Sequence, residues 1–137
     1  MADDQLPDSV VAAADAIKSG EMSARELTSA CIEKAEQLQP QLNCFISFQP
    51  EKALAVADAL DAALLSGDPV GPLHGVPMAH KDMYYRAGEI STCGSKIRKN
   101  FRPDHTATVI QRLDDAGAIH LGGLNMAEFA FGPTGHN

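Results

Sequence analysis

The feature that most constrains the fold is a strand–helix–strand succession in the second half of the chain. Residues 76–80 (VPMAH) form an apolar run of strand length, and residues 106–116 show helical spacing that Gly117 closes. The apolar face of this helix carries Val109, Ile110 and Leu113. Residues 118–121 (AIHL) form a second short strand. Strands joined through a helix pair in parallel, and helices cover both faces of such a sheet. The sequence therefore predicts an α/β fold with a mixed, largely parallel sheet.

The first half of the chain is predominantly helical in pattern. Apolar spacing predicts a first helix over residues 9–19. The segment Ser23–Glu26 fits a capping box, in which the serine and glutamate side chains satisfy backbone N–H groups, and it predicts a second helix that ends at Pro40. Residues 42–48 alternate as in a strand, and a third helix that starts with proline is predicted over residues 50–66.

The last residues of the chain indicate a domain that continues. The Gly-Gly pair at 122–123 lacks the spacing of a phosphate loop and predicts a tight turn between strand and helix. Asn125 is placed like the first residue of a further helix. Two or three strands are too few for a sheet that helices cover on both faces. We interpret residues 1–137 as the N-terminal part of a single domain, with residues 1–67 as a mostly helical lead-in and residues 68–137 as the start of the core.

Composition disfavours several classes of function. A formal net charge of -7 argues against binding to a nucleic-acid backbone, which requires clustered Lys and Arg. The one short basic cluster is assigned to a solvated loop and consists of Lys96, Arg98, Lys99 and Arg102. The first ten residues lack a signal peptide and no apolar run reaches membrane-spanning length, so a cytoplasmic protein without membrane binding is expected. Three irregularly spaced cysteines are expected to be reduced, and the histidines lack metal-binding spacing.

Lys81 follows the apolar run of residues 76–80 directly and is a candidate general base. An amine acts as a base only when neutral, and burial at the end of a strand disfavours its charged form. The alternative is that Lys81 and Asp82 are simply solvated where the strand leaves the core, and the residue pattern alone favours this alternative. Asp82 is expected to cap the turn that follows rather than to orient the lysine.

Other polar residues of the second half are assigned structural roles. Cys93, within STCGS, lacks a neighbouring base and oxyanion site and is interpreted as a bystander thiol. Hydroxyl side chains in the same segment fit either a loop near a site or a plain turn; they are Ser91, Thr92 and Ser95. His80 and His120 are expected to be packed rather than catalytic.

Four segments of the second half occur in an order that resembles the amidase signature family, the serine hydrolases that cleave carbon–nitrogen amide bonds. The segments are GPLHGVPMAHKD, TCGS, DHTATVIQRLDDAGAIHLG and LNMAEFAFGPTGHN, between Gly71 and Asn137. Their order and intervals carry the resemblance, and the N-terminal helices are compatible with it. The resemblance implies the amidase signature fold, of which this chain holds an incomplete part.

The resemblance implies a Ser-cis-Ser-Lys triad in which Lys81 is the catalytic base. One serine, in a cis peptide, relays the proton while a second attacks the amide carbonyl, and water then opens the acyl-enzyme. Both serines and the oxyanion hole belong to a Gly/Ser-rich segment that follows the region matching GPTGHN and is not in this sequence. Ser91 and Ser95 do not match the triad serines, so residues 1–137 alone are expected to be inactive. The scheme requires no cofactor or metal.

The resemblance further implies a small-molecule amide as the substrate. Gly123 and Leu124 stand where many family members have Lys-Thr, and the FGPTGHN ending favours a general small-amide hydrolase. The alternative within the family is a glutamine amidotransferase A-type subunit that modifies mischarged tRNA. An alternative from a different class is a non-catalytic α/β interaction module that binds a partner through its sheet edge. For the complete enzyme we expect a homodimer and no direct nucleic-acid binding.

Overall fold

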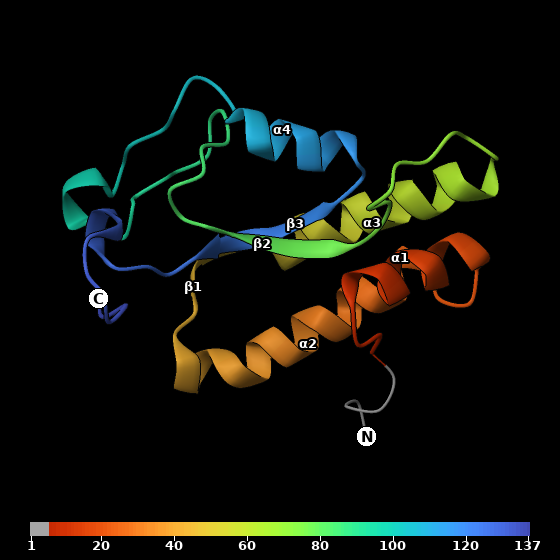
Figure 1. Cartoon of the computed structure of the whole chain (residues 1–137), viewed down its shortest axis with the longest axis horizontal. Helices are drawn as coiled ribbons and strands as arrows, with labels where there is room; N and C mark the ends of the chain where they lie inside the picture. The colour runs from red at the N-terminus through yellow and green to blue at the C-terminus, as the bar shows by residue number, and fades with distance from the viewer. Residues whose placement is uncertain (1–5) are drawn as a thin grey trace.

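A three-stranded sheet with helices on both faces organises the chain, as the computed structural model shows for residues 6–137 (Figure 1). The expectation that the N-terminus lacks a signal peptide rests partly on residues 1–5, which lie outside the described residues. The elements are α1 (Val10–Ser19), α2 (Ala24–Leu42), β1 (Phe45–Phe48), α3 (Pro50–Leu65), β2 (Pro77–Lys81), the 3-10 helix η1 (Lys96–Arg98), α4 (Thr108–Asp115), β3 (Ile119–Leu124) and the 3-10 helix η2 (Glu128–Ala130).

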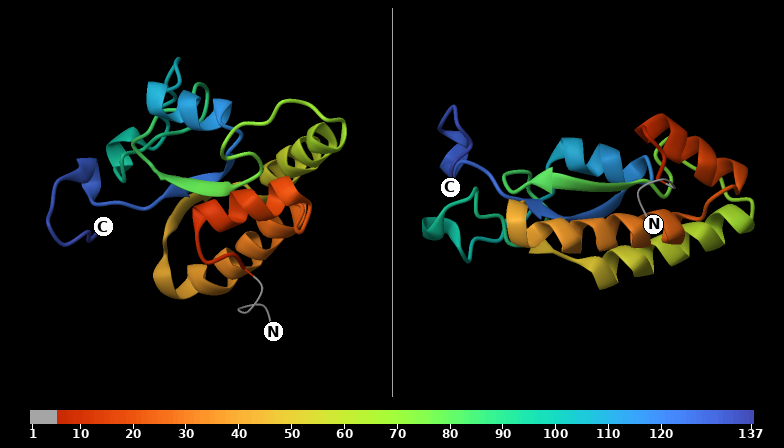
Figure 2. Two further views of the ribbon diagram at one scale, coloured as in Figure 1. Left: turned by 45° about the vertical axis from the view of Figure 1, so that its right-hand side comes forward. Right: turned by 90° about the horizontal axis from the view of Figure 1, so that it is seen from below.

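The sheet has the strand order β1-β3-β2. β2 and β3 pair in parallel, with Lys81 opposite Leu124, and α4 lies on the connection between them. β1 joins the other edge of β3 in antiparallel orientation, with Phe45 opposite Leu124. The mixed α/β sheet predicted from the strand–helix–strand pattern is therefore confirmed. In Figure 2, α4 lies on one side of the sheet and α1, α2 and α3 lie on the other.

The helix ends follow from local side-chain chemistry. The capping box is confirmed: the Ser23 hydroxyl accepts the Glu26 N–H at 3.0 Å, and the Glu26 carboxylate accepts the Ser23 N–H at 2.8 Å. The predicted end of this helix at Pro40 is wrong, because α2 continues to Leu42. A proline removes only one hydrogen bond in a last turn, and the helix ends instead at Asn43, which adopts a left-handed conformation with φ 47°.

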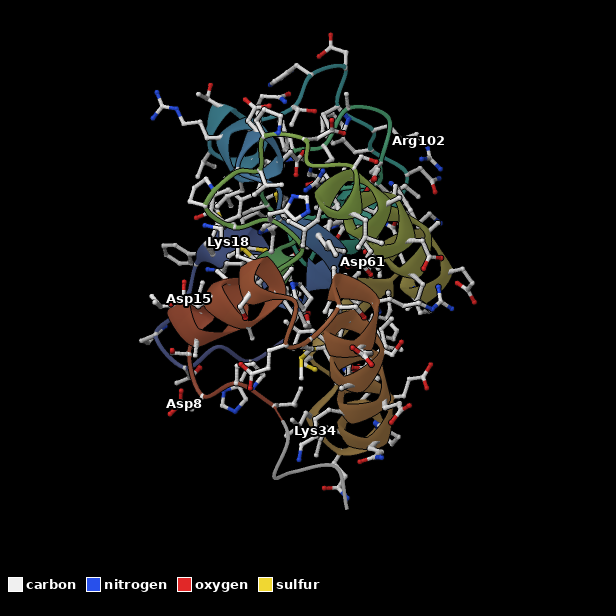
Figure 3. All side chains as sticks on the ribbon, turned by 90° about the vertical axis from the view of Figure 1, so that its right-hand side faces the viewer. Asp8, Asp15, Lys18, Lys34, Asp61 and Arg102 are labelled. Carbon is white, nitrogen blue, oxygen red and sulfur yellow. The ribbon has the colours of Figure 1, made fainter. Side chains whose placement is uncertain are left out.

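The core lies between the sheet and the three N-terminal helices. Its fully buried side chains include Ile17 of α1, Ala57 of α3 and Ile119 of β3. Asp61 of α3 also holds the start of α2, because its carboxylate accepts the N–H groups of Ala24 at 2.7 Å and Arg25 at 3.0 Å (Figure 3). A carboxylate is favourable at a helix N-terminus, where unpaired N–H groups and the helix dipole meet. The lead-in helices are thus fixed to one another and to the sheet.

The end of the crossover departs from the sequence-based prediction. The Gly-Gly pair lies inside β3 rather than in a turn, because β1 approaches this strand too closely for a side chain. Gly122 has φ 156°, and a Cβ atom there would lie 2.1 Å from the carbonyl oxygen of Ser47. The helix predicted from Asn125 is also wrong: only η2 forms, and the φ angles of Phe129 (51°) and Ala130 (56°) are incompatible with an α-helix. Asn125 instead extends the strand region, since its N–H donates to the Cys44 carbonyl at 2.7 Å.

None of the helices described over residues 6–137 is long and apolar enough to cross a membrane.

Replacing Gly122 with alanine tests the close approach of β1 and β3. We expect Gly122→Ala to lower the free energy of unfolding by about 3 kcal/mol or more, because the new methyl group collides with the backbone at Ser47. Gly67→Ala is the matched control, since Gly67 has φ 78° with open space around it and only backbone strain of about 1 kcal/mol is expected. Urea unfolding of both variants measures the difference, and equal losses would contradict this packing.

Candidate functional site

Lys81 is the last residue of β2, at the carboxyl end of the parallel strand pair. Its carbonyl oxygen accepts the N–H groups of Met83 at 2.7 Å and Tyr84 at 3.1 Å, so a tight turn follows the strand immediately. The predicted strand over residues 76–80 is therefore shifted by one residue. The Lys81 side chain is exposed in the described chain, in agreement with the alternative that the residue pattern favoured, whereas Asp82 is buried, because successive side chains of a strand point to opposite sides. The catalytic role of Lys81 stays a prediction.

Asp82 joins the end of β2 to the STCGS segment. Its buried carboxylate accepts the Thr92 N–H at 2.9 Å and also accepts a short hydrogen bond from the Thr92 hydroxyl. Its backbone N–H donates to Leu124 at 3.0 Å, and its carbonyl oxygen accepts the Cys93 N–H at 2.9 Å. The sequence-based expectation that Asp82 caps the next turn is wrong, since its partner lies ten positions further along the chain. We call this set of contacts, centred on Asp82, the Asp82 clamp.

The STCGS segment is a loop in which Ser91, Cys93 and Ser95 are buried. The Ser91 hydroxyl donates to the Asp82 carbonyl oxygen at 3.2 Å, and the Ser95 hydroxyl donates to the Glu128 carboxylate at 2.5 Å. Cys93 is buried with φ 53° and accepts a hydrogen bond from the Arg98 guanidinium at 3.4 Å. The hydroxyl groups of Ser91 and Ser95 therefore connect the loop to β2 and to η2.

Asn137 is a residue to which the sequence assigned no role. Its side-chain amide donates to the carbonyl oxygens of Gly94 and Met126, both at 2.7 Å. These bonds hold residue 137 against the STCGS loop, and Figure 1 shows the C-terminus at the same end of the molecule as η1 and η2. The sequence around an asparagine does not indicate which distant carbonyl groups its side chain will bind, so this contact could not be predicted.

A polar hollow opens beside Lys81, where the ends of the strands meet the loop that follows β2. Residues from all three strands line it. The lining consists of Ser47, His80, Lys81, Asp82, Tyr84, Arg86, Glu89, Ile90, Ser91, His120 and Gly123. The space at Gly123 is too narrow for a larger residue. A Cβ atom there would lie 2.9 Å from the Ser47 hydroxyl and 3.3 Å from the Asp82 carboxylate. The arrangement places an exposed amine next to several fixed hydrogen-bonding groups.

Charged pairs fix Arg86 and Glu89, which also line the hollow. Arg86 makes a bidentate bond to Asp114 of α4, at 2.8 and 2.7 Å. Glu89 accepts hydrogen bonds from Lys52 at 2.5 Å and Gln49 at 3.1 Å. Burial raises the pKa of the Glu89 carboxyl, but the hydrogen bonds from Lys52 and Gln49 outweigh it and the pKa lies below its usual value. The Glu89 carboxyl group is therefore ionised and already accepts hydrogen bonds from Lys52 and Gln49.

The two histidines of the hollow are packed, as expected from the sequence, and the structure shows that their rings stack on each other. Burial lowers the pKa of His120 to about 4, with further contributions from the Arg86 and His80 charges, against the opposing effect of Glu89. Burial and Arg86 likewise lower the pKa of His80, while Asp114 opposes the shift. Both rings are therefore neutral at pH 7. Over residues 6–137, no group of three or more His, Cys, Asp or Glu side chains has the arrangement of a metal site.

Removing the carboxylate of Asp82 tests the clamp. We expect Asp82→Ala to lower the free energy of unfolding by about 2 kcal/mol, because the Thr92 N–H and hydroxyl lose a charged acceptor in a buried position. Asp68→Ala is the matched control, since Asp68 lies exposed in a loop, and a change within about 0.5 kcal/mol is expected. Both values come from urea unfolding, and a similar result for the two variants would show that the clamp contributes no stability.

The chain is similar in sequence to amidotransferase subunits and in structure to amidases. The A-type subunit of glutamyl-tRNA(Gln) amidotransferase from Halorhodospira halophila is 47% identical over 119 residues, which are 87% of this chain and 24% of that protein. The structure of peptide amidase from Stenotrophomonas maltophilia superimposes with a TM-score of 0.81 at 34% identity, covering 89% of this chain and 25% of that one. A bacterial aryl acylamidase of the amidase signature family gives a TM-score of 0.88 at 29% identity, over 95% of this chain and 27% of that one.

The chain therefore spans about a quarter of the length of these relatives. The family model described as Amidase matches residues 26–137, which include the strand–helix–strand unit, the Asp82 clamp and the hollow beside Lys81. The fold predicted from the order of the four sequence segments agrees with that of the solved amidases. This chain belongs to the amidase signature family.

Proposed function

We propose that this chain supplies the lysine base of an enzyme that hydrolyses the carbon–nitrogen bond of a small-molecule amide. The observation that carries the proposal is the position of Lys81: its backbone is held by β3 and by the turn after β2, while its side chain is exposed beside a polar hollow. A rigid backbone with a free amine suits a general base, because the amine must meet the group that it deprotonates at a fixed distance.

The chemistry follows the base, relay and nucleophile scheme. The neutral Lys81 amine takes a proton from a relay serine, which takes the proton of a nucleophilic serine as that oxygen attacks the amide carbonyl. The leaving amine departs with a proton returned along the same path, and water then opens the acyl-enzyme ester. The two serines are expected in a Gly/Ser-rich segment outside this sequence. That segment also has to cover Lys81, because burial is what disfavours the charged form of an amine and the described residues leave this side chain exposed.

A second candidate is the A-type subunit of a glutamine amidotransferase, favoured by the names of curated relatives. The subunits of Halorhodospira halophila and Lachnospira eligens are 47% and 46% identical to this chain. Lys81 would have the same role in either enzyme, since releasing ammonia from glutamine is also an amide hydrolysis. Copurification with further subunits would favour this candidate, whereas a homodimer would favour the stand-alone hydrolase.

The packing around Gly123 supports the first candidate. Glycine stands here where many family members have lysine, and the Ser47 hydroxyl and the Asp82 carboxylate occupy the space that a side chain would need. The Gly123 N–H also donates to the Ser47 hydroxyl at 3.1 Å. A lysine at this position would require the side chains of Ser47 and Asp82 to shift, so the site beside Lys81 differs from that of relatives with Lys-Thr.

A chimera tests the role of Lys81 in catalysis. Residues 26–137 replace the matching segment of peptide amidase from Stenotrophomonas maltophilia, and ammonia release from a peptide amide is measured. We expect Lys81→Ala to lower kcat/KM by a factor of roughly a thousand or more, because the nucleophile loses its base. Lys99→Ala, which removes an exposed lysine of the basic cluster, should leave kcat/KM within about twofold. Near-normal turnover of Lys81→Ala would overturn the assignment.

The coding sequence downstream of codon 137 provides an independent test. We expect a Gly/Ser-rich segment with two serines to follow within a few tens of residues, since the triad needs a relay and a nucleophile. Sequencing the transcript reads this directly. A transcript that ends without such a segment would exclude amide hydrolysis by this gene product alone and would favour the non-catalytic α/β interaction module.

A further inference from the structure

The side chains of His80 and His120 form a stacked pair on neighbouring strands. Their ring centroids are 5.0 Å apart and the ring planes differ by 7°. His80 lies on β2 directly before Lys81, and His120 lies on β3. The β2–β3 register shifts between Met78 and His80, so the stack occurs at an irregular point of the ladder. The two rings therefore meet where β2 ends, directly before Lys81.

The surroundings of the pair offer a newly charged ring one distant carboxylate and little water. Among the described residues, His120 Nδ1 and Arg86 Nε are buried without a hydrogen-bond partner. The carboxylate that faces the ring is that of Glu89, whose oxygen lies 3.8 Å from His120 Nε2, and this oxygen already accepts a hydrogen bond from Gln49. The 12% exposure of the His120 side chain leaves little contact with water. A proton added to this ring would therefore create a poorly solvated cation next to a guanidinium.

We propose that the His80–His120 stack is an acid-sensitive contact that holds the end of β2, and with it Lys81, in place only while both rings are neutral. The part of this proposal that concerns regulation of the active site rests on the proposed role of Lys81. The contact itself does not depend on that role, since it follows from the geometry of the two rings.

Protonation opens the contact through charge repulsion and the need for water. One imidazolium ring in the stack is repelled by Arg86 and is poorly hydrated, so the protonated ring turns toward solvent. His80 carries the movement into β2, because it precedes Lys81 directly. The backbone contacts exposed to this movement are the pairs His80–Gly123 and Lys81–Leu124 and the hydrogen bond from the Asp82 N–H to Leu124. Lys81 would then lose its fixed position before the rest of the sheet unfolds.

Several of the charged groups that face the stack are paired with a group of opposite charge. The histidines are therefore the groups whose charge changes as the pH falls. The charged groups are Lys52 of α3, Asp114 of α4, Arg86 and Glu89 of the loop after β2, and Lys81 and Asp82 at the end of β2. Arg86 is paired with Asp114, and Glu89 is paired with Lys52. A histidine whose pKa is lower in the folded chain than in the unfolded chain stabilises the fold fully above the unfolded value. This stabilisation decreases as the pH falls from the ordinary histidine pKa of 6.5 toward the value of about 4 for His120.

Two measurements on the 137-residue chain test the proposal. NMR titration should show that the pKa of His120 lies at about 4 and that the pKa of His80 lies below the ordinary histidine value of 6.5. Hydrogen exchange should show that the protection of the Asp82 amide, relative to that of Ala57 in α3, falls roughly tenfold between about pH 7.5 and about pH 5. The amide of Ala57 serves as the internal reference because it lies in the core of α3.

The variant His80→Phe with His120→Phe keeps two stacked rings that cannot be protonated. It should keep the relative protection of Asp82 constant over the same pH range, whereas the control His105→Phe should behave like the wild-type chain. Ordinary titration of both rings in the wild-type chain overturns the proposal, and this result does not require the variant to fold. Constant protection in the wild type, or an equal loss in the double phenylalanine variant, overturns it as well. None of these readouts involves catalysis, so failure of Lys81→Ala to affect the chimera would leave them interpretable.

Discussion

The parallel pairing of β2 with β3 is the constraint on which the rest of the structure depends. The crossover through α4 places the two strands side by side, and the pairing of Lys81 with Leu124 fixes where β2 ends. Asp82 then enters the interior and binds Thr92, and His80 stacks on His120 from the neighbouring strand. A shift of one residue in this register would exchange the inward and outward side chains, so the lysine and the aspartate would change places.

Local signals allowed much of the fold to be predicted from the sequence. The capping box at Ser23 and the proline that starts α3 act within one turn of the chain, so α2 and α3 begin where expected. The alternation of apolar strands with a helix was sufficient to predict the β2–α4–β3 unit. The Gly-Gly pair was misassigned because its glycines are required by the approach of β1, which lies 76 positions away along the chain. Nothing in the residues around 122 reports that neighbour.

In the candidate site, too, features set by neighbouring residues were predictable and features set by distant residues were not. The resemblance identified Lys81, and the residue pattern placed it at the end of a strand and favoured its exposure to solvent. The pattern did not indicate that the Asp82 carboxylate beside it is buried. The pairs that shape the hollow were not predictable, since Arg86 and Asp114 are 28 positions apart and Lys52 and Glu89 are 37 positions apart. Opposite charges at such separations are common in any soluble chain, and only the folded structure determines which of them meet. The histidine stack was predicted as packing, but the residue pattern could not show that the two rings pack on each other.

The contacts of Asn137 have a consequence for the entropy of ordering the segment after η2. Its amide binds Gly94, in the loop that is hydrogen-bonded to Asp82 through Thr92, and it also binds Met126, 11 positions earlier in the chain. Residues 126–137 therefore form a short closed loop. The entropic cost of closing a loop grows with its length, so a loop of this length is closed at low cost. Two hydrogen bonds from one amide group are thus enough to fix this segment against the STCGS loop.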